Sequence, residues 1–519
     1  MKKIFIVISI FISLSSFAQT DVNVNTNLTF NGESNLVRNP LNGNLTAEWM
    51  KLIFSPTTIS MATSMSTDNG ATWSTPNLLP HHYGNVSTSA DPTMAYHNSN
   101  GKLYAAYIDS RNTHDSGAVY VVSSMNSGTT WSTPVKAVDA NGYADFPVDR
   151  PWIAVDNSGT ASDGTVYLVT KSYKNGAMPH KVWFSKSTDG GLTWSQIARI
   201  DTPAQTGLIS NSMGIPAVGA DGKFYIAYLS YDLSQSINAR AMLATSSNQG
   251  QTFSYSVIYN AVAGSGISAS DTLYQPSYSL SANPLDANNL IFIFTDNRNG
   301  DPDIYETHCV SGLNFTPEIR LNDDTLSNGK GQDMCWGNFS NTGIYSCCWR
   351  DRRNGTNGQN STFQIFTTNS PDDGVFWSPN MQLSSGTSNV VPYAEGNDFI
   401  GVAVSDSEVH CTWANQTGNI PQIFTNTAGF VSAVTVLPNE NGIKIYPNPT
   451  SDFIFIEQPN ENKKLKVVIT SVDGKELVQQ YFTNTKTEID LKSFSAGVYF
   501  VNVFDEKNRK VGLCRVVKN

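Results

Sequence analysis

The chain has 519 residues, which is too long for a single ordinary domain; 39% of the residues are hydrophobic and only 15% are charged. This composition allows a large apolar core and excludes long disordered regions. Residues 19–440 hold 19 basic and 34 acidic side chains, a net charge of −15. Phosphates are repelled by such a region, so it is excluded as a general ligand of nucleic acid or anionic membranes, and an anionic substrate would need locally placed arginines.

The first 18 residues have the pattern of a signal peptide. Met1-Lys2-Lys3 is a short basic region, Ile4 to Leu14 is apolar, and Ser16-Phe17-Ala18 has small residues at the positions that a cleavage site requires. The apolar run is too short to span a membrane, and no later segment reaches 18 consecutive apolar residues. We expect cleavage after Ala18, export, and no membrane span in the mature form; the alternative is a buried N-terminal helix.

One octet recurs along the chain and begins with its clearest copy, Ser66-Thr67-Asp68-Asn69-Gly70-Ala71-Thr72-Trp73. Further copies start at residues 124, 187, 246 and 370, and a degenerate copy starts at residue 308, where the spacing requires one. Asp or Asn can accept hydrogen bonds from the backbone, Gly tolerates positive φ, and the aromatic residue anchors the turn. We therefore assign these octets a structural role. The residues at the acidic position are Asp68, Asn126, Asp189, Asn248 and Asp372.

These octets resemble the Asp-box, or BNR repeat, of the sialidase superfamily and other β-propellers. The resemblance implies that each octet is the turn between the third and fourth strands of a propeller blade. The flanking sequence agrees, because segments 91–96, 102–108, 117–123 and 133–138 are short runs of β-branched and aromatic residues separated by turn residues. Helical periodicity is absent.

The number of repeated units follows from the innermost strands, which we expect to start near residues 34, 91, 150, 215, 275, 333 and 397. This predicts an all-β fold with a seven-bladed β-propeller over residues 19–436. Its last unit lacks an obvious fourth strand, which the segment from Val22 to Phe30 can supply, and closure of the ring removes exposed strand edges. The alternative is six blades, the number in the sialidases that the repeat resembles.

A separate domain follows a linker at residues 437–442. Residues 443–519 open with Ile443-Lys444-Ile445-Tyr446-Pro447-Asn448-Pro449 and later contain Ala496-Gly497-Val498-Tyr499-Phe500. These motifs resemble the type A sorting domain of the type IX secretion system of Bacteroidetes, and the alternating runs predict a small β-sandwich. The resemblance implies a contact with the secretion machinery, export across the outer membrane, and surface attachment or release. The alternative is an accessory carbohydrate-binding module.

The sequence indicates neither a metal site nor a cofactor. The six cysteines show no spacing typical of zinc, and buried free thiols are favoured over a bridge from Cys335 to Cys347 or Cys348. Asp156 and Asp163 could be calcium ligands, but ordinary turn chemistry explains them better.

We expect the ligand face at the end of the propeller opposite the octets, around the mouth of the central channel. Three Asp-x-Arg motifs follow second strands at this end, at Asp109 to Arg111, Asp296 to Arg298 and Asp351 to Arg353. Arginine matches carboxylates and sulfates bidentately, although pairing inside each loop is the favoured explanation of the repeated motif. The predicted ligand-binding residues are Arg111, Arg150, Trp152, Gln275, Arg298, Asp333 and Arg353.

The resemblance to sialidases also implies catalytic groups: an arginine triad, an acid/base aspartate, and a tyrosine nucleophile activated by a glutamate. The acid would be Asp91 or Asp149, and Tyr393 with Glu395 could face one side of an extended segment. The Arg-Ile-Pro signature of the family is absent, and the nearest match is Arg38-Asn39-Pro40. Two functions stay open. One is a secreted or cell-surface propeller that binds glycans or proteins without chemistry; the other is an exo-acting glycoside hydrolase on sialylated or other acidic glycans.

Overall fold

The computed structural model describes residues 20–25, 29–54, 57–113, 116–139, 148–172, 182–201, 213–230, 240–260, 277–311, 313–355, 362–389, 399–418, 420–430, 443–446, 450, 452–458, 463–471, 475–495, 497–507 and 510–518. The chain divides into two compact units, Met1–Phe430 and Val431–Asn519. The predicted signal peptide and the predicted linker lie outside the described residues.

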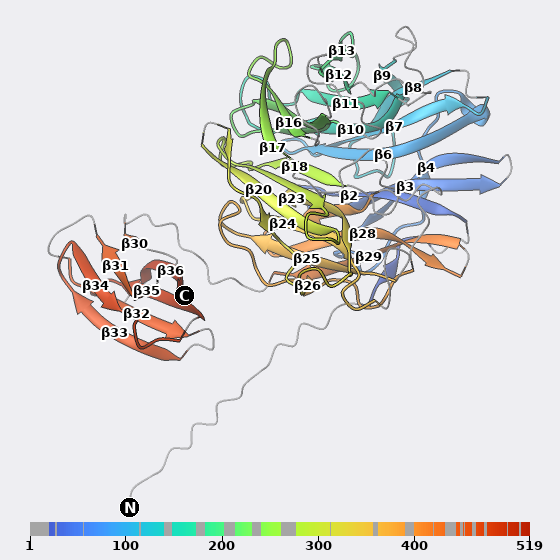
Figure 1. The fold of residues 1–519 in the computed structure, drawn as a ribbon. Helices are drawn as coiled ribbons and strands as arrows, with labels where there is room; N and C mark the ends of the chain where they lie inside the picture. The colour runs from blue at the N-terminus through green and yellow to red at the C-terminus, as the bar shows by residue number, and fades with distance from the viewer. Residues whose placement is uncertain are drawn as a thin grey trace, which may run out of the picture. The chain divides into compact units, whose positions relative to one another are not determined.

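Unit 1 consists of antiparallel sheets in which four strands follow one another from one edge to the other (Figure 1). The first sheet is β2 (Asn31–Arg38), β3 (Leu45–Phe54), β4 (Thr57–Ser66) and β5 (Asn77–Leu78), and the second is β6 (Ser87–His97), β7 (Lys102–Arg111), β8 (Gly117–Ser124) and β9 (Val135–Val138). The third is β10 (Val148–Val155), β11 (Val166–Ser172), β12 (Val182–Ser187) and β13 (Ala198–Arg199), and the fourth is β14 (Ile215–Val218), β15 (Phe224–Ser230), β16 (Arg240–Ser246) and β17 (Ser254–Asn260).

The later sheets keep this order with two variations. The fifth is β18 (Tyr278–Ala282), β19 (Leu290–Asp296), β20 (Asp303–Ser311) and β21 (Asn314–Phe315), with β22 (Ile319–Arg320) also paired to β20. The sixth is β23 (Gln332–Phe339), β24 (Tyr345–Asp351), β25 (Gln364–Ser370) and β26 (Met381–Gln382). The seventh takes β27 (Gly401–Val404), β28 (Glu408–Thr417) and β29 (Ile420–Gly429) from the end of the unit and β1 (Val22–Asn23) from its beginning.

The first strands of the sheets form a closed ring. In the described residues β2 contacts β6, and the contacts continue through β10, β14, β18, β23 and β27 back to β2. Hydrophobic clusters fill the spaces between neighbouring sheets, for example from Tyr104 of β7 to Leu168 of β11. Because each apolar strand face is covered by the next sheet, unit 1 has a core that runs around the ring.

The N-terminal strand completes the last sheet, as the sequence predicted. Val22 pairs with Thr425 and Asn23 with Phe424, and the backbone N–H of Val24 donates to the carbonyl of Ile423 at 2.9 Å. The first and last segments of unit 1 are therefore held together by backbone hydrogen bonds.

The predicted octets are turns between third and fourth strands. In the first copy Ser66 Oγ donates to Asp68 Oδ1 at 2.8 Å, and the N–H of Thr72 donates to the same oxygen at 2.9 Å. The corresponding N–H bond recurs at Asn126, Asp189, Asn248 and Asp372 with distances from 2.7 to 3.0 Å. In the degenerate copy the hairpin persists, with Cys309 paired to Phe315.

Five cysteines are described, and all are buried free thiols. Cys347 pairs across the sheet with Gly337 and Cys348 with Trp336, while Cys335 lies in a register shift between these strands. The favoured prediction of buried thiols therefore agrees with the described residues.

Unit 2 has two antiparallel sheets that share one hydrophobic core. One sheet is β30 (Lys444–Tyr446), β31 (Phe453–Glu457) and β34 (Lys486–Asp490), and the other is β33 (Glu476–Phe482), β32 (Leu465–Ser471), β35 (Gly497–Phe504) and β36 (Lys510–Lys518). Ile454 and Ile456 of the first sheet cluster with Val467 and Val501 of the second. This two-layer arrangement is the predicted sandwich.

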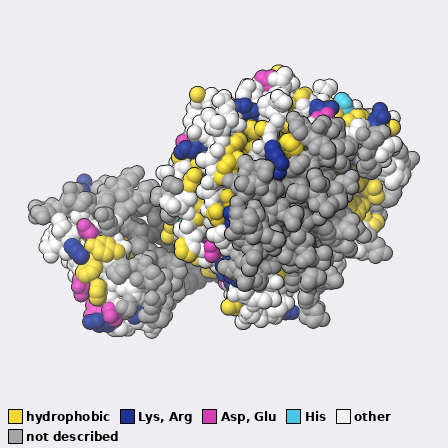
Figure 2. Space-filling view, turned by 45° about the horizontal axis from the view of Figure 1, so that its top comes forward, with side chains coloured by type: hydrophobic (Ala, Val, Ile, Leu, Met, Phe, Trp, Pro, Cys, Tyr) yellow, Lys and Arg dark blue, Asp and Glu magenta, His cyan; other side chains and the backbone are white. Residues whose placement is uncertain are grey.

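The only helical element in the described residues is the short 3₁₀ turn η1 (Gly84–Val86). No helix in the described part of the chain has the length and apolar character needed to cross a membrane. On the face seen in Figure 2, the charged side chains of the described residues are scattered and do not gather into one patch.

Candidate active site at the hub

Inner strands β2, β6, β10 and β23 each contain a register shift close to the end where the strand begins. Within these shifts a residue other than glycine has positive φ: Glu33 at 49°, Asp91 at 53°, Arg150 at 47° and Met334 at 53°. Side chains disfavour this conformation, and such backbone strain clusters at functional sites. Since β6 contacts both β2 and β10, three of these bulges lie on adjacent strands around the channel.

These bulges bring three carboxyl groups into one hydrogen-bonded chain. Asp91 shares a hydrogen bond with Glu33 on one side and with Asp149 on the other. Asp91 Oδ2 also accepts the backbone N–H of Arg150 at 2.9 Å. Glu33 and Asp91 are only 3% and 7% exposed. Carboxyl groups this close cannot all carry a charge, so at least one proton is shared among them.

Two cations complete this group, which we call the hub site: Glu33, Asp91, Asp149, Arg150 and Lys171. Lys171 Nζ lies 3.1 Å from Asp149 Oδ2 and is 2% exposed. Burial lowers the pKa of Lys171, and the charge of Asp149 acts in the opposite direction. Burial acts to raise the pKa of Asp149, but the charges of Lys171 and Arg150 and the hydrogen bond from Asp91 leave it lowered.

At Asp91, in contrast to Asp149, the effects that raise the pKa outweigh those that lower it. Burial raises its pKa to about 6, and the negative charge of Asp149 adds to this effect, while the hydrogen bond to Glu33 and the charge of Arg150 act to lower it. The hub site therefore pairs a carboxyl group that holds its proton towards neutral pH with a neighbour that stays ionised. Such divergent pKa values are how one site supplies both an acid and a carboxylate.

Aromatic side chains lie next to the hub site. The rings of Trp152 and Trp336 stack with centroids 4.4 Å apart, Phe399 meets Trp152 edge-on at 5.2 Å, and the guanidinium of Arg150 lies 5.0 Å from the Phe399 centroid. Trp152 and Trp336 also line a cavity of about 300 Å³ among the later residues of the inner strands. The predicted ligand residue Trp152 is 5% exposed, so its role here is to pack beneath the charged groups.

Two of the predicted ligand-binding arginines, Arg298 and Arg353, form ion pairs with nearby carboxylates. Arg298 Nη2 lies 2.8 Å from Asp296 Oδ2, and its Nη1 lies 3.3 Å from Glu318. Arg353 pairs in the same way with Asp351 at 2.8 Å and with Asp323 at 2.6 Å. The favoured explanation of the motif, pairing of the arginine with the aspartate of its own loop, therefore holds for these two copies.

In the third Asp-x-Arg motif, Asp109 to Arg111, the two charged side chains have separate partners. Arg111 is exposed and lies over the ring of Tyr83 at 5.8 Å, while Asp109 bonds to His81, Ser87 and Ser89 instead. The predicted pair between Asp109 and Arg111 does not form, because nearer donors saturate the carboxylate.

Asp333 is a buried internal carboxylate. Arg350 holds it through two hydrogen bonds of 2.7 and 2.6 Å, and Arg352 Nη1 lies 3.1 Å away. Burial acts to raise the pKa of Asp333, but the charges of both arginines lower it to about 2. The two guanidinium groups that converge here are thus already neutralised by the protein, which removes them from the binding of an anionic ligand.

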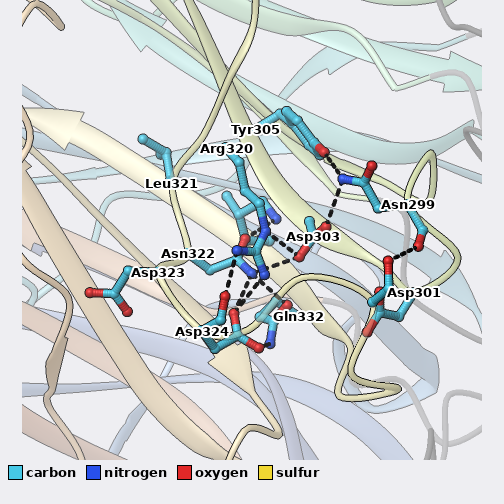
Figure 3. A network of polar contacts seen from close by, with 12 residues as sticks. Asn299, Asp301, Asp303, Tyr305, Arg320, Leu321, Asn322, Asp323, Asp324 and Gln332 are labelled. Carbon is cyan, nitrogen blue, oxygen red and sulfur yellow. Dashed lines mark hydrogen bonds and ion pairs between the residues drawn. The ribbon is translucent and has the colours of Figure 1, made fainter. Parts of the chain in front are cut away.

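A further polar network stabilises the loop that precedes β23 (Figure 3). Arg320 bonds to Asp303 at 2.7 Å and to Asp324 at 2.8 Å, and Asn322 donates to the same two carboxylates. In the described residues, no group of three or more His, Cys, Asp or Glu side chains is arranged to hold a metal ion. Asp156 and Asp163, weighed as calcium ligands, accept hydrogen bonds from their own turn.

Three predicted site residues, Gln275, Tyr393 and Glu395, lie outside the described residues. Conversely, sequence reasoning missed Glu33. A signal is available, since Glu33 occupies the position in the first unit that Asp91 occupies in the second, but the predicted strand start, Ser34, is one residue too late.

Comparison with known families matches residues 444–517 to the secretion system C-terminal sorting domain. The chain carries a sorting domain of the type IX secretion system. The sorting domain covers most of unit 2, and it indicates export to the cell surface or the extracellular space.

Solved structures similar to the chain include sialidases and an arabinofuranosidase. A Hadza microbial sialidase is 15% identical, with 75% of this chain and 74% of that chain covered and a TM-score of 0.44. The α-L-arabinofuranosidase of Fusarium graminearum is 12% identical, with 79% and 98% covered and a TM-score of 0.44. The Trypanosoma rangeli sialidase is 13% identical, with 78% and 59% covered and a TM-score of 0.41. No curated protein matches the chain.

Proposed function

We propose that the chain is an exported glycoside hydrolase with a seven-bladed propeller, and that its hub site acts on glycans that are neutral rather than sialylated. The observation that carries this proposal is the carboxyl chain of Glu33, Asp91 and Asp149 on three adjacent strained bulges. Glycoside hydrolysis needs one protonated and one ionised carboxyl group beside the scissile bond. Asp91, whose pKa is raised to about 6, has the properties of the acid.

The balance of charge in the hub site supports a neutral substrate. Three carboxyl groups face two cations, of which Lys171 already pairs with Asp149. Residues 19–430 contain ten arginines, and the undescribed loop segments in this range contain none. Those near the inner strands of the sixth sheet, Arg350 and Arg352, bind Asp333. Because at least one of the three carboxyl groups keeps a proton, the two cations of the hub site are already balanced by carboxylates. A sialic acid carboxylate would add an unmatched negative charge, whereas a neutral sugar would not.

The proposal is tested by hydrolysis of fluorogenic glycosides by the purified protein. We expect turnover of a neutral glycoside and none of the sialoside, with Asp91→Asn lowering kcat/KM at least about 100-fold because an amide cannot donate the acid proton. Asp221→Asn is the matched control, since Asp221 is an exposed turn residue that pairs with Lys223. Activity that depends on Asp91 should fall as the pH rises above about 6, where that carboxyl group ionises.

Two results would contradict the proposal. Preferential turnover of the sialoside would restore the sialidase interpretation. Binding of glycans without hydrolysis of any glycoside would instead support the non-catalytic propeller.

A further inference from the structure

A second group of catalytic type joins the first two sheets and shares no residue with the hub site. His81 belongs to the connection from β5 to β6, and its ring bridges two strands. His81 Nε2 lies 2.7 Å from Ser60 Oγ on β4, and its Nδ1 lies 3.3 Å from Asp109 Oδ1 on β7. Serine, histidine and aspartate thus follow one another in hydrogen-bond contact.

The partners of His81 determine which ring nitrogen carries the proton. Nδ1 faces the carboxylate of Asp109, which can only accept, so Nδ1 is the donor to that oxygen. Ser89 Oγ, which also contacts Nδ1 at 2.9 Å, donates to Asp109 Oδ1 at 3.0 Å. Neutral imidazole then has its lone pair on Nε2, where it accepts the hydroxyl proton of Ser60. This is the orientation of a general base beside a nucleophile.

Asp109 is fixed as the residue that orients the histidine. It is 0% exposed, and its Oδ2 accepts the backbone N–H of His82 at 2.6 Å and Ser87 Oγ at 3.1 Å. Every one of these partners is a donor, so the carboxylate is held in place from several sides. A fixed carboxylate stabilises the imidazolium that forms when Nε2 takes a proton.

We propose that Ser60, His81 and Asp109 form an acyl-transfer site that hydrolyses esters of short-chain acids. Ser60 is 5% exposed and the His81 side chain 15% exposed, which limits the proposal to a small acyl group such as acetyl. Lys51 is the cross-strand partner of Ser60, which places its side chain on the same face of the sheet. A positive charge on that face would stabilise an oxyanion.

The reaction needs only the ester and water. Ser60 Oγ forms a bond to the acyl carbon while its proton moves to His81 Nε2. The bond from the acyl carbon to the alcohol oxygen then breaks, and the alcohol leaves with that proton. Water attacks the acyl-serine, gives one proton to Nε2, and releases the acid as the proton returns to Ser60 Oγ.

The test combines a fluorophosphonate probe, which labels activated serines, with hydrolysis of p-nitrophenyl acetate by the full-length exported protein. We expect a single labelled site at Ser60, found by peptide mass mapping. Ser60→Ala and His81→Gln should each lower esterase kcat at least about 100-fold. The matched control is Ser64→Ala, because Ser64 is a buried serine of the same strand whose hydroxyl bonds to Ser74.

Folding of each variant is checked by its thermal melting curve. If Ser60→Ala unfolds, Ser60→Cys provides a second test. A thiol at this position that is activated by His81 should react with iodoacetamide, and adding His81→Gln to the Ser60→Cys variant should slow that reaction. Absence of probe labelling in the folded wild-type protein would overturn the proposal, as would equal labelling of Ser60→Ala. The glycosidase is measured with Asp91→Asn on a glycoside and the esterase with Ser60→Ala on p-nitrophenyl acetate, so the two proposals can fail independently.

Discussion

At the scale of single residues, the burial of Glu48 on β3 lowers the stability of the folded chain. It is 0% exposed, and neither carboxylate oxygen has a hydrogen-bond partner in the described residues. Burial raises its pKa well above the ordinary value of 4.5. A carboxyl group in this position is held in its protonated form.

Substitution of Glu48 should therefore change how stability depends on pH. Because the folded pKa is raised, the folded chain binds more protons than the unfolded chain above pH 4.5, and stability falls as the pH rises towards the folded pKa. Glu48→Gln removes this loss, so its free energy of unfolding should rise relative to wild type by up to about 1.4 kcal/mol per pH unit in that range. Urea unfolding at pH 5 and pH 8 measures the difference. Glu318→Gln, a partly exposed control, should lack this gain; an equal pH dependence in wild type and Glu48→Gln would contradict the prediction.

The residues of the hub site show how far a candidate site can be predicted from the sequence. Asp91, Asp149 and Arg150 could be proposed because each stands at the start of a repeated inner strand. Glu33 is harder to recognise although it occupies the matching position in the first unit, because its strand contains a register shift and one residue of error in a strand reverses the face of every side chain. The partners of Asp109 were equally hidden, since His81 belongs to the preceding connection and not to the Asp-x-Arg motif.

At the scale of elements, the octet turns hold the third and fourth strands together with local bonds. Asp189 Oδ1 accepts Ser187 Oγ at 2.8 Å and the N–H of Thr193 at 2.9 Å, and Oδ2 accepts Thr193 Oγ1 at 2.5 Å. These bonds lower the pKa of Asp189 to about 2, led by the one from the Thr193 side chain. All of the partners lie within four residues, which explains why these turns were predictable from sequence.

Removal of the acidic side chain from one octet should destabilise unit 1 modestly. We expect Asp189→Ala to lower the free energy of unfolding by about 1 to 2 kcal/mol, the usual effect of losing charge-assisted hydrogen bonds. Because the folded pKa of Asp189 is depressed, its contribution is present above the ordinary value of 3.8 and is lost as the pH falls towards 2. The measurement is urea unfolding at pH 7 and at pH 3. Asp221→Ala, in an exposed turn, is the control, and equal losses in the two variants would argue against a special role for the octet.

At the scale of the whole molecule, the ring closes where β27 lies against β2. A Cβ atom at Gly401 would come within 2.5 Å of the backbone nitrogen of Leu36 and within 2.7 Å of the carbonyl carbon of Asn35. Backbone atoms cannot move aside as a flexible side chain can. This close approach joins residues far apart in sequence, so no local pattern marks Gly401 as special.

Gly401→Ala should therefore weaken the closure of the ring. We expect a loss of about 3 kcal/mol in the free energy of unfolding, at the upper end of the usual cost of overpacking. Thermal and urea unfolding of unit 1 measure it. Gly429→Ala is a control in the same sheet, because a Cβ atom there would meet only the Ser407 carbonyl, at 4.0 Å. Comparable stability of the two variants would show that the strands can separate without cost.

The pairing of β1 with the last sheet also dictates a folding order. Asn426 donates to Asp21 across 405 positions of the chain, and joining ends so distant costs about 5 kcal/mol of loop entropy. The final joint cannot form until a ribosome has delivered nearly the entire first unit. A nascent polypeptide thus stays open at this seam during synthesis, and the ring locks only after both ends of unit 1 are present.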